Sequence, residues 1–194
     1  MRQIQAKWHK NTIMSVFAFF VFGLMNVSTA DTSVVKHDPV LDKSVMATLG
    51  QCQQVSASCT DTTKDAAGVL VFPSVVKADL IIGGAGGKGA LIENGVITGY
   101  YSIGAGSAGL QIGVESASQI YVFRTADSLA NLKGGPDWKV GATAGVTVMS
   151  ADANASSSTG SILVYIFDSK GLNAGISLDT FDIWKTARAR PSAS

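Results

Sequence analysis

Short apolar runs separated by glycine clusters dominate the chain between Gly68 and Val114. The runs are rich in β-branched residues and cover Val69–Phe72, Leu80–Ile82, Ala90–Ile92 and Val96–Thr98. Further on, apolar positions alternate with polar or small ones at Leu110, Ile112 and Val114, and this period of two is typical of a half-buried strand. Each interior glycine would cost a helix ~1 kcal/mol relative to alanine. The stretch therefore predicts a tightly hydrogen-bonded antiparallel sheet, in which glycines let another backbone, a ring or a ligand come close.

Local signals around these runs predict one hairpin and two helices. The pair Asn94-Gly95 is typical of a tight turn between two strands. The pair Asp38-Pro39 predicts a helix start, and apolar residues at helical spacing continue to Gly50, where we expect this helix to end. A second short helix is expected over Thr60–Ala67. Both helices are expected to cover one face or one open end of the sheet.

The rest of the chain predicts further strands and one short helix. The expected helix covers Thr125–Leu132. The expected strands are Gln119–Thr125, a long strand Trp138–Ser150, a hairpin of Ser161–Phe167 with Gly171–Leu178, and Phe181–Trp184. The fold class is accordingly α+β, mainly β: a glycine-rich twisted antiparallel sheet, either a sandwich or a partly closed barrel, with short helices at the N-terminus packed on it.

The first thirty residues have the composition of an export signal. A basic group comes first, then an apolar run, then small residues: Arg2, Lys7 and Lys10, Ile13–Met25, and Ser28–Ala30. The apolar run is shorter than the ~20 residues that a membrane span needs. We expect residues 1–30 to be a signal peptide that is cleaved near Ala30, leaving a periplasmic or secreted protein. An uncleaved N-terminal anchor is the alternative.

Charge excludes one class of partner. Without residues 1–30 and their three cations, the chain keeps 164 residues with 12 basic and 14 acidic side chains. This length suffices for one domain with a sizeable core. The near-neutral balance excludes nucleic-acid binding through bulk positive charge. Attraction to an anionic lipid would therefore need a local patch of cations.

Cys52 and Cys59 are the only cysteines, and six residues separate them. In an exported protein this pair predicts a disulfide. A zinc site is the weaker interpretation, because His37 is the only histidine after residue 30 and completes no zinc-ligand set. We expect no metal and no cofactor.

Motifs of catalysis and nucleotide binding are incomplete. Two matches to GxGxxG, Gly84–Gly89 and Gly104–Gly109, continue into strand-like sequence instead of a helix, so a dinucleotide site is not expected. The segment around Lys88 lacks the first glycine and the Ser/Thr of a P-loop. No spacing singles out a carboxylate pair among Asp79, Glu93, Glu115, Asp168, Asp179 and Asp182. We therefore expect a protein that is not an enzyme; a hydrolase with an unrecognised carboxylate pair is a further alternative.

The order of several sequence blocks resembles the SYLF domain, also called the Ysc84 actin-binding or Las17-binding-protein domain. The blocks are GVLVFPSVVKA from Gly68, IGGAGGKGALI from Ile82, GYYSIGAGSAGLQIG from Gly99, YVFRT from Tyr121, WKVG from Trp138 and IFDSKGLNAGISL from Ile166. The resemblance spans roughly Asp38–Lys185. Residues 31–185 are therefore expected to form a single SYLF-like domain, followed by a disordered tail over residues 186–194.

The resemblance implies lipid binding, with phosphoinositides and actin as partners of eukaryotic members and a secreted or envelope location for bacterial ones. Actin-binding members use a lysine-rich N-terminal region that this chain lacks, so actin is not expected as a partner. The cations nearest the glycine-rich blocks are the candidate lipid-binding residues: Lys64, Lys77, Lys88 and Arg124. The expected function is a non-enzymatic domain of the bacterial envelope that binds anionic phospholipid at a membrane surface through one rim of cations. The alternative is a periplasmic interaction or scaffold module without lipid affinity.

Overall fold

The structure is a computed structural model that describes residues 35–78, 84–106, 116–149, 159–168, 171–172, 178 and 181–186. These residues all fall within one compact unit, Val35–Ser194. The predicted signal peptide over residues 1–30 and the predicted tail beyond residue 186 lie outside the described residues. The expected strand around Leu110–Val114 also lies outside them. Among the helices of the described part, none is long and apolar enough to cross a membrane.

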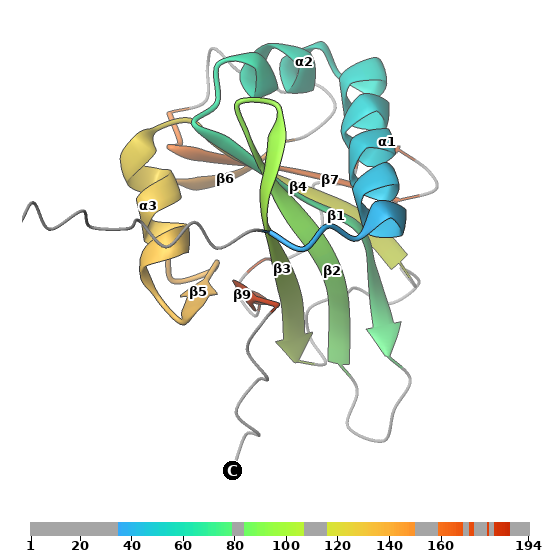
Figure 1. Cartoon of the computed structure of the whole chain (residues 1–194). Helices are drawn as coiled ribbons and strands as arrows, with labels where there is room; N and C mark the ends of the chain where they lie inside the picture. Colours follow the sequence, from blue (N-terminus) through green and yellow to red (C-terminus); the bar gives the residue numbers. More distant parts are fainter. Residues whose placement is uncertain are drawn as a thin grey trace, which may run out of the picture. The chain divides into compact units, whose positions relative to one another are not determined.

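Three helices and nine strands make up the described fold (Figure 1). The helices are α1 (Pro39–Val55), α2 (Ala57–Lys64) and α3 (Ala126–Gly134). The strands are β1 (Gly68–Ala78), β2 (Gly84–Glu93), β3 (Val96–Gly106), β4 (Ser116–Phe123), β5 (Asp137–Lys139), β6 (Val146–Met149), β7 (Ile162–Asp168), β8 (Gly171–Leu172) and β9 (Phe181–Lys185).

All strands belong to one curled sheet with the order β5-β9-β3-β2-β1-β4-β7-β6, and β8 pairs with β7. Every pairing is antiparallel except that of β6 with β7, which is parallel. The predicted class is confirmed: the fold is α+β, mainly β, with a half-barrel sheet and two helices near the N-terminus packed on it. The parallel pair makes the sheet mixed instead of purely antiparallel.

The predicted hairpin joins β2 to β3. Asn94 and Gly95 have φ angles of +51° and +77° in its turn. Positive φ at both central residues is the conformation that asparagine and glycine tolerate best, and it matches the twist of the flanking strands. The turn thus sets the register of the first pairs, Glu93↔Val96 and Ile92↔Ile97. A shift by one residue between Ile92 and Leu91 then gives the register that continues to Gly84↔Gly106.

The start of α1 agrees with the prediction, and its end does not. Asp38 caps the helix, because its carboxylate accepts hydrogen bonds from two backbone N–H groups of the first turn at 3.2 Å. The helix then continues through Gly50 to Val55. Thr48 and Cys52 are buried on either side of Gly50, so tertiary burial outweighs the low helix propensity of one glycine. The second helix begins at Ala57, three residues before the predicted start.

The long strand predicted over Trp138–Ser150 is wrong. It is two short strands, β5 and β6, joined by a turn in which Gly145 has a φ of +82°. The N–H of Val140 donates to the carbonyl of Phe181 at 3.0 Å, whereas β6 pairs with β7. The two halves therefore join opposite ends of the strand order.

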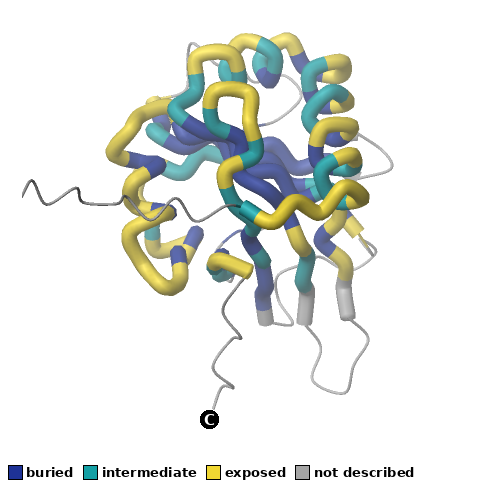
Figure 2. The backbone as a smooth tube through the Cα atoms, in the orientation of Figure 1, coloured by how far each residue is buried: buried dark blue, intermediate teal, exposed yellow. Residues whose placement is uncertain are grey.

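Two apolar clusters lie on the two faces of the sheet. The first joins the helices α1 and α2 to β1, β4 and β7 through Val45, Cys59, Val71, Ile120 and Tyr165. Figure 2 shows these buried strands behind helices whose outer surfaces are exposed.

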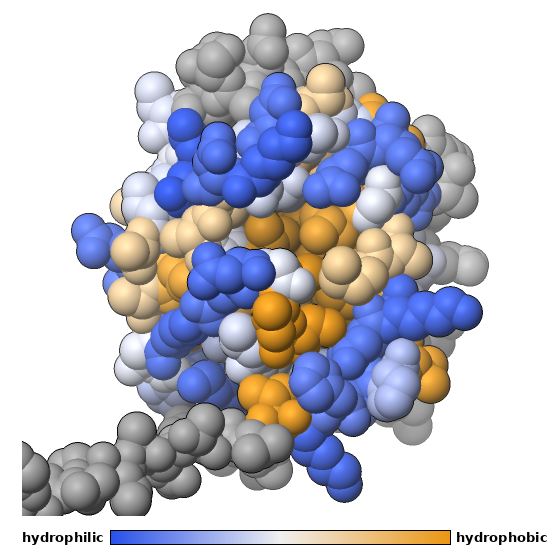
Figure 3. Space-filling view, turned by 45° about the horizontal axis from the view of Figure 1, so that its top comes forward, coloured by the Kyte–Doolittle hydropathy of each residue, from blue (hydrophilic) through white to orange (hydrophobic). Residues whose placement is uncertain are grey.

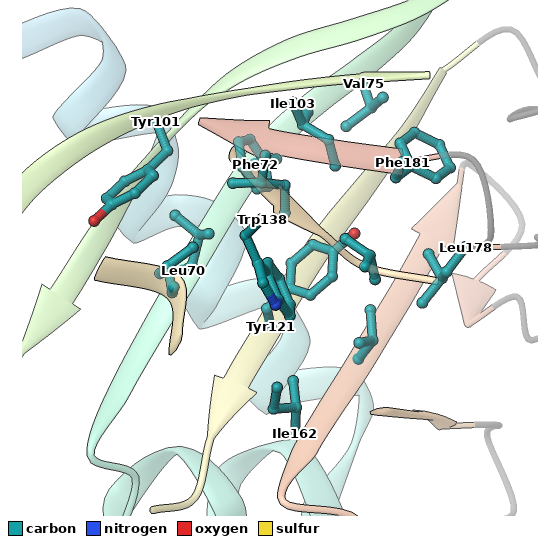
Figure 4. Close-up of a cluster of buried hydrophobic side chains, with 14 of the residues drawn as sticks. Leu70, Phe72, Val75, Tyr101, Ile103, Tyr121, Trp138, Ile162, Leu178 and Phe181 are labelled. Carbon is teal, nitrogen blue, oxygen red and sulfur yellow. The ribbon is translucent and has the colours of Figure 1, made fainter. Parts of the chain in front are cut away.

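The second cluster fills the inside of the curl. Figure 4 shows Phe72, Tyr121, Trp138 and Phe181 meeting there from four strands. The Phe72 and Tyr121 rings meet edge-on at a centroid distance of 6.0 Å. Phe72 thus belongs to the cluster inside the curl, not to the one that α1 and α2 cover.

Candidate functional site

A β-bulge in the central strand β1 shapes the surface below α1. The pairing of β1 with β2 shifts between Val71 and Ser74, and Ser118 Oγ donates a hydrogen bond of 2.7 Å to the carbonyl of Pro73 within the bulge. Proline has no N–H to give to a ladder, so a bulge is where a central strand tolerates it. The bulge also changes the alternation of side chains: Val71 faces the helices, but Val75 faces the inside of the curl.

Because of this change, Ser74 and Val76 point outward, on the same side of the sheet as α1. Both are exposed, and Val76 retains 46% of its accessible surface. Lys88 lies opposite Ser74 on β2 and Ser102 lies opposite Lys88 on β3, so their side chains share this face. We call Ser74, Val76, Lys88 and Ser102 the outer strip. In Figure 1 the ends of β1, β2 and β3 run on together past the first turn of α1.

A small polar pocket adjoins the outer strip. Its volume is about 200 Å³. Among the described residues, its lining comes from α1, β1, β4 and β7: Gln51, Pro73, Ser74, Ser116, Ala117, Ser118 and Phe167. We call it the serine pocket. It combines three hydroxyls and one amide with the apolar surfaces of a phenyl and a pyrrolidine ring, and none of these lining side chains is ionisable.

The four candidate cations do not lie along one rim. Lys64 ends α2, and Arg124 follows β4 beside the start of β1, because Gly68 pairs with Phe123. Lys77 lies near the far end of β1, nine residues from Gly68, which at ~3.3 Å per residue is ~30 Å away. Lys88 lies between these ends. The side chain of Lys77 is outside the described part of the structure.

The environments of Lys88 and Arg124 also differ. Lys88 is exposed on the outer strip. Arg124 is held at the opposite end of the sheet, where its Nη1 donates a 3.1 Å hydrogen bond to the carbonyl of Gly160. Of the four candidates, Lys88 is therefore the one whose side chain the structure places beside the serine pocket. The role of all four in lipid binding remains a prediction.

Of the six acids that the sequence offers as possible catalytic carboxylates, the two whose side chains are described, Glu93 and Asp182, lie in ion pairs with lysines. Glu93 accepts a 2.6 Å hydrogen bond from Lys133 and a 2.5 Å hydrogen bond from Thr98. Partial burial alone would raise the pKa of Glu93, but these hydrogen bonds and the Lys133 charge outweigh it and lower the pKa. Asp182 lies 3.3 Å from Lys139. Asp79, Glu115 and Asp179 and the side chain of Asp168 lie outside the described residues.

His37 belongs to a cluster that sequence reasoning missed. Its Nδ1 lies 3.0 Å from a carboxylate oxygen of Asp42, and the other oxygen of Asp42 accepts a 2.5 Å hydrogen bond from the hydroxyl of Tyr100. That hydroxyl also accepts from the N–H of Asp38 at 2.9 Å. Desolvation and the hydrogen bond to Asp42 raise the pKa of Tyr100. The cluster ties the start of α1 to β3, a contact between residues too distant in sequence for any local pattern to reveal.

Tyr100 and Tyr101 face opposite sides, as their alternation predicts. Tyr101 is buried inside the curl, and Tyr100 packs beneath α1. The hydroxyl of Tyr100 therefore has its hydrogen-bond partners at the start of α1.

The predicted cysteine pair is joined in the structure. Cys52 in α1 and Cys59 in α2 form a disulfide, and both are fully buried against the sheet. The disulfide fixes the corner between the two helices that cover one face of the sheet. Within the described residues, no three His, Cys, Asp or Glu side chains gather as a set of metal ligands.

Comparison with known proteins finds one family that is similar to the C-terminal part of this fold. No curated protein matches the chain. A family model does: residues 104–189 match Ysc84, described as Las17-binding protein actin regulator. The match covers β4 to β9 and the last residues of β3, whereas the sequence blocks in β1 and β2 that also suggested the family precede it. Residues 104–189 are therefore similar to the Ysc84 family, the family that the order of the sequence blocks predicted.

Proposed function

We propose that the chain is a non-enzymatic lipid-binding protein of the bacterial envelope that acts at a membrane surface. The observation that carries the proposal is the composition of the outer strip. An exposed cation, Lys88, lies beside two hydroxyls and an exposed apolar side chain, Val76, on a face that the helices leave open. A lysine and hydroxyl groups can bind the phosphate oxygens of a lipid headgroup. An exposed valine can enter the boundary between the headgroups and the acyl chains.

Magnitudes indicate weak, salt-sensitive binding. A cation near an anionic membrane surface contributes ~1 kcal/mol, so Lys88, the cation of the outer strip, would supply ~1 kcal/mol. Full burial of a valine side chain contributes ~1.5 kcal/mol, and Val76 would gain only about half of that because half of it is already covered. Stable attachment would therefore need many copies on one surface or specific headgroup contacts.

Vesicle co-sedimentation tests the proposal. The purified oxidised protein is mixed with anionic and neutral vesicles at two salt concentrations, together with Lys88→Glu and the matched charge reversal Lys64→Glu at the opposite end of the sheet. We expect binding to anionic vesicles that falls with salt, falls several-fold further in Lys88→Glu, and is retained in Lys64→Glu. Equal loss in both variants would remove the outer strip from the mechanism. No vesicle binding by the unaltered protein would reject lipid binding.

A protein-interaction module is the second candidate. Figure 3 shows apolar residues in the middle of one face, with hydrophilic residues around them. Val40 and Val96 are the most exposed of the described large apolar side chains, at 78% and 60%. Recovery of one stoichiometric partner from envelope extract, lost in Val40→Ser/Val96→Ser, together with no affinity for vesicles, would favour this function.

A further inference from the structure

We propose that the serine pocket binds the uncharged polyol part of a phosphorylated headgroup, such as a glycerol or sugar, while Lys88 holds the phosphate. This inference rests on the proposed lipid-binding function and names the chemical class of its ligand. It begins from the lining of the pocket, which consists of hydroxyl and amide groups beside two apolar rings.

The hydrogen-bonding capacity of this lining matches a polyol. Ser118 already donates its hydroxyl hydrogen to the carbonyl of Pro73, so its oxygen is left to accept. Ser74, Ser116 and Gln51 make no side-chain hydrogen bond within the described part of the structure, so they are free to donate as well as accept. A polyol offers the same mixed pattern, because each of its hydroxyls both donates and accepts.

The absence of ionisable groups from the described lining argues against the phosphate itself as the occupant. A phosphate in the pocket would meet only neutral hydroxyls and one amide, whereas charged donors form the stronger hydrogen bonds to phosphate. A described cation stands just outside: Lys88 pairs with Ser74, and Cβ atoms of such neighbours lie ~5 Å apart. A phosphate attached to a polyol in the pocket would then lie within reach of the lysine's four-carbon side chain.

Size limits the occupant to one small group. The volume of about 200 Å³ is below the ~300–1,000 Å³ typical of pockets for drug-sized ligands. The rings of Phe167 and Pro73 give an apolar surface for the carbon skeleton of the polyol. The pocket therefore fits a headgroup but not an acyl chain.

Two lipids with the same acyl chains separate this inference from simple charge attraction. Phosphatidylglycerol carries a glycerol beyond its phosphate, and phosphatidic acid carries at least as much charge but no polyol. We expect at least fivefold tighter binding to phosphatidylglycerol vesicles than to phosphatidic acid vesicles. This preference should disappear in Ser74→Ala/Ser116→Val and persist in two controls: Ser102→Ala, which lies on the outer strip outside the pocket, and Ser116→Thr, which keeps the hydroxyl.

Soluble probes distinguish a lipid headgroup from a free polyol phosphate. Glycerol 1-phosphate and inorganic phosphate are titrated into the protein, and the amide shifts of Ser74 and of residues 116–118 are followed by NMR. Shifts with glycerol 1-phosphate that exceed those with inorganic phosphate support the pocket. Such shifts without any vesicle binding would retain the polyol site and reject the lipid function. Equal binding to both lipids, unchanged by the pocket variants, would reject the polyol site and retain the lipid function.

Discussion

The indole of Trp138 meets the ring of Tyr121 edge-on, with 5.7 Å between the ring centroids. Trp138 lies on the edge strand β5 and Tyr121 lies on β4, and four strands separate the two in the sheet. The contact therefore spans the inside of the curl, where Trp138 also packs against Phe123 at 5.5 Å. This aromatic contact holds the edge of the sheet against its centre.

Removal of this contact should destabilise the fold. Trp138→Ala is expected to lower the free energy of unfolding by ~3–5 kcal/mol, because it leaves a cavity in the cluster. Trp138→Phe should cost less, since it keeps a ring and removes a buried indole N–H that has no hydrogen-bond partner among the described residues. Urea denaturation checks both values. A cost below ~1 kcal/mol for Trp138→Ala would show that the curl closes without it.

Gly89 is expected to resist any side chain. A Cβ there would clash with the Val71 carbonyl oxygen and lie 2.5 Å from Cδ1 of Phe72, opposite the bulge. Gly89→Ala should lower the free energy of unfolding by at least ~2 kcal/mol. The matched control is Gly86→Ala on the same strand, where the one contact that a Cβ would make with the described residues is with the Ile103 oxygen at 3.5 Å. Equal costs for the two variants would contradict this account of the bulge.

Replacement of Gly50 by alanine is expected to stabilise the protein, in contrast to the same change at Gly89. Gly50 lies inside α1, and a Cβ there would meet no atom of the described part of the chain within 4 Å. Gly50→Ala should therefore raise the free energy of unfolding by ~1 kcal/mol, because alanine is the better helix former. Gly95→Ala, at a φ of +77°, should lower it. Thermal denaturation of the two variants gives the signs directly, and a lower melting temperature for Gly50→Ala would contradict the continuous helix.

Tyr101 should make stability fall at alkaline pH. Burial, and to a lesser extent the charge of Glu93, raises its pKa from 10.0 to about 12. The unfolded chain releases this proton near pH 10, but the folded chain holds it, so the contribution is complete below pH 10 and is lost between pH 10 and 12. The loss is about 2–3 kcal/mol at most. Urea denaturation of the protein and of Tyr101→Phe between pH 9 and 11.5 isolates this effect, and identical slopes would contradict it.

The disulfide should contribute through the unfolded state. The bond between Cys52 and Cys59 closes a short loop, for which the loss of chain entropy corresponds to ~2–3 kcal/mol. Cys52→Ala/Cys59→Ala should lower the free energy of unfolding by about this amount, and a reducing agent should then have no further effect. A reducing agent that destabilises the double variant as much as the original protein would show that the effect has another cause.

The sequence by itself determined the elements whose causes are local. Asp38-Pro39 begins α1, Asn94-Gly95 forms the hairpin turn, and Thr125 caps α3, because each acts on backbone groups within a few residues. The disulfide could also be predicted from the sequence, because its two cysteines are close along the chain. For the same reason the class of the fold, mainly β with N-terminal helices, followed from the alternation of apolar residues and glycines.

The tertiary structure alone decided what depends on distant neighbours. Gly50 stays helical because the residues around it are buried on the sheet, and the stretch from Trp138 to Met149 splits because its halves find different partners, β9 and β7. The bulge at Pro73 turns Ser74 outward, beside Lys88, while the strand register sends Arg124 to the other end of the sheet. The periodicity of one segment cannot predict these pairings. The direction of a side chain depends on the register of its strand, and the register is set by the neighbouring strands.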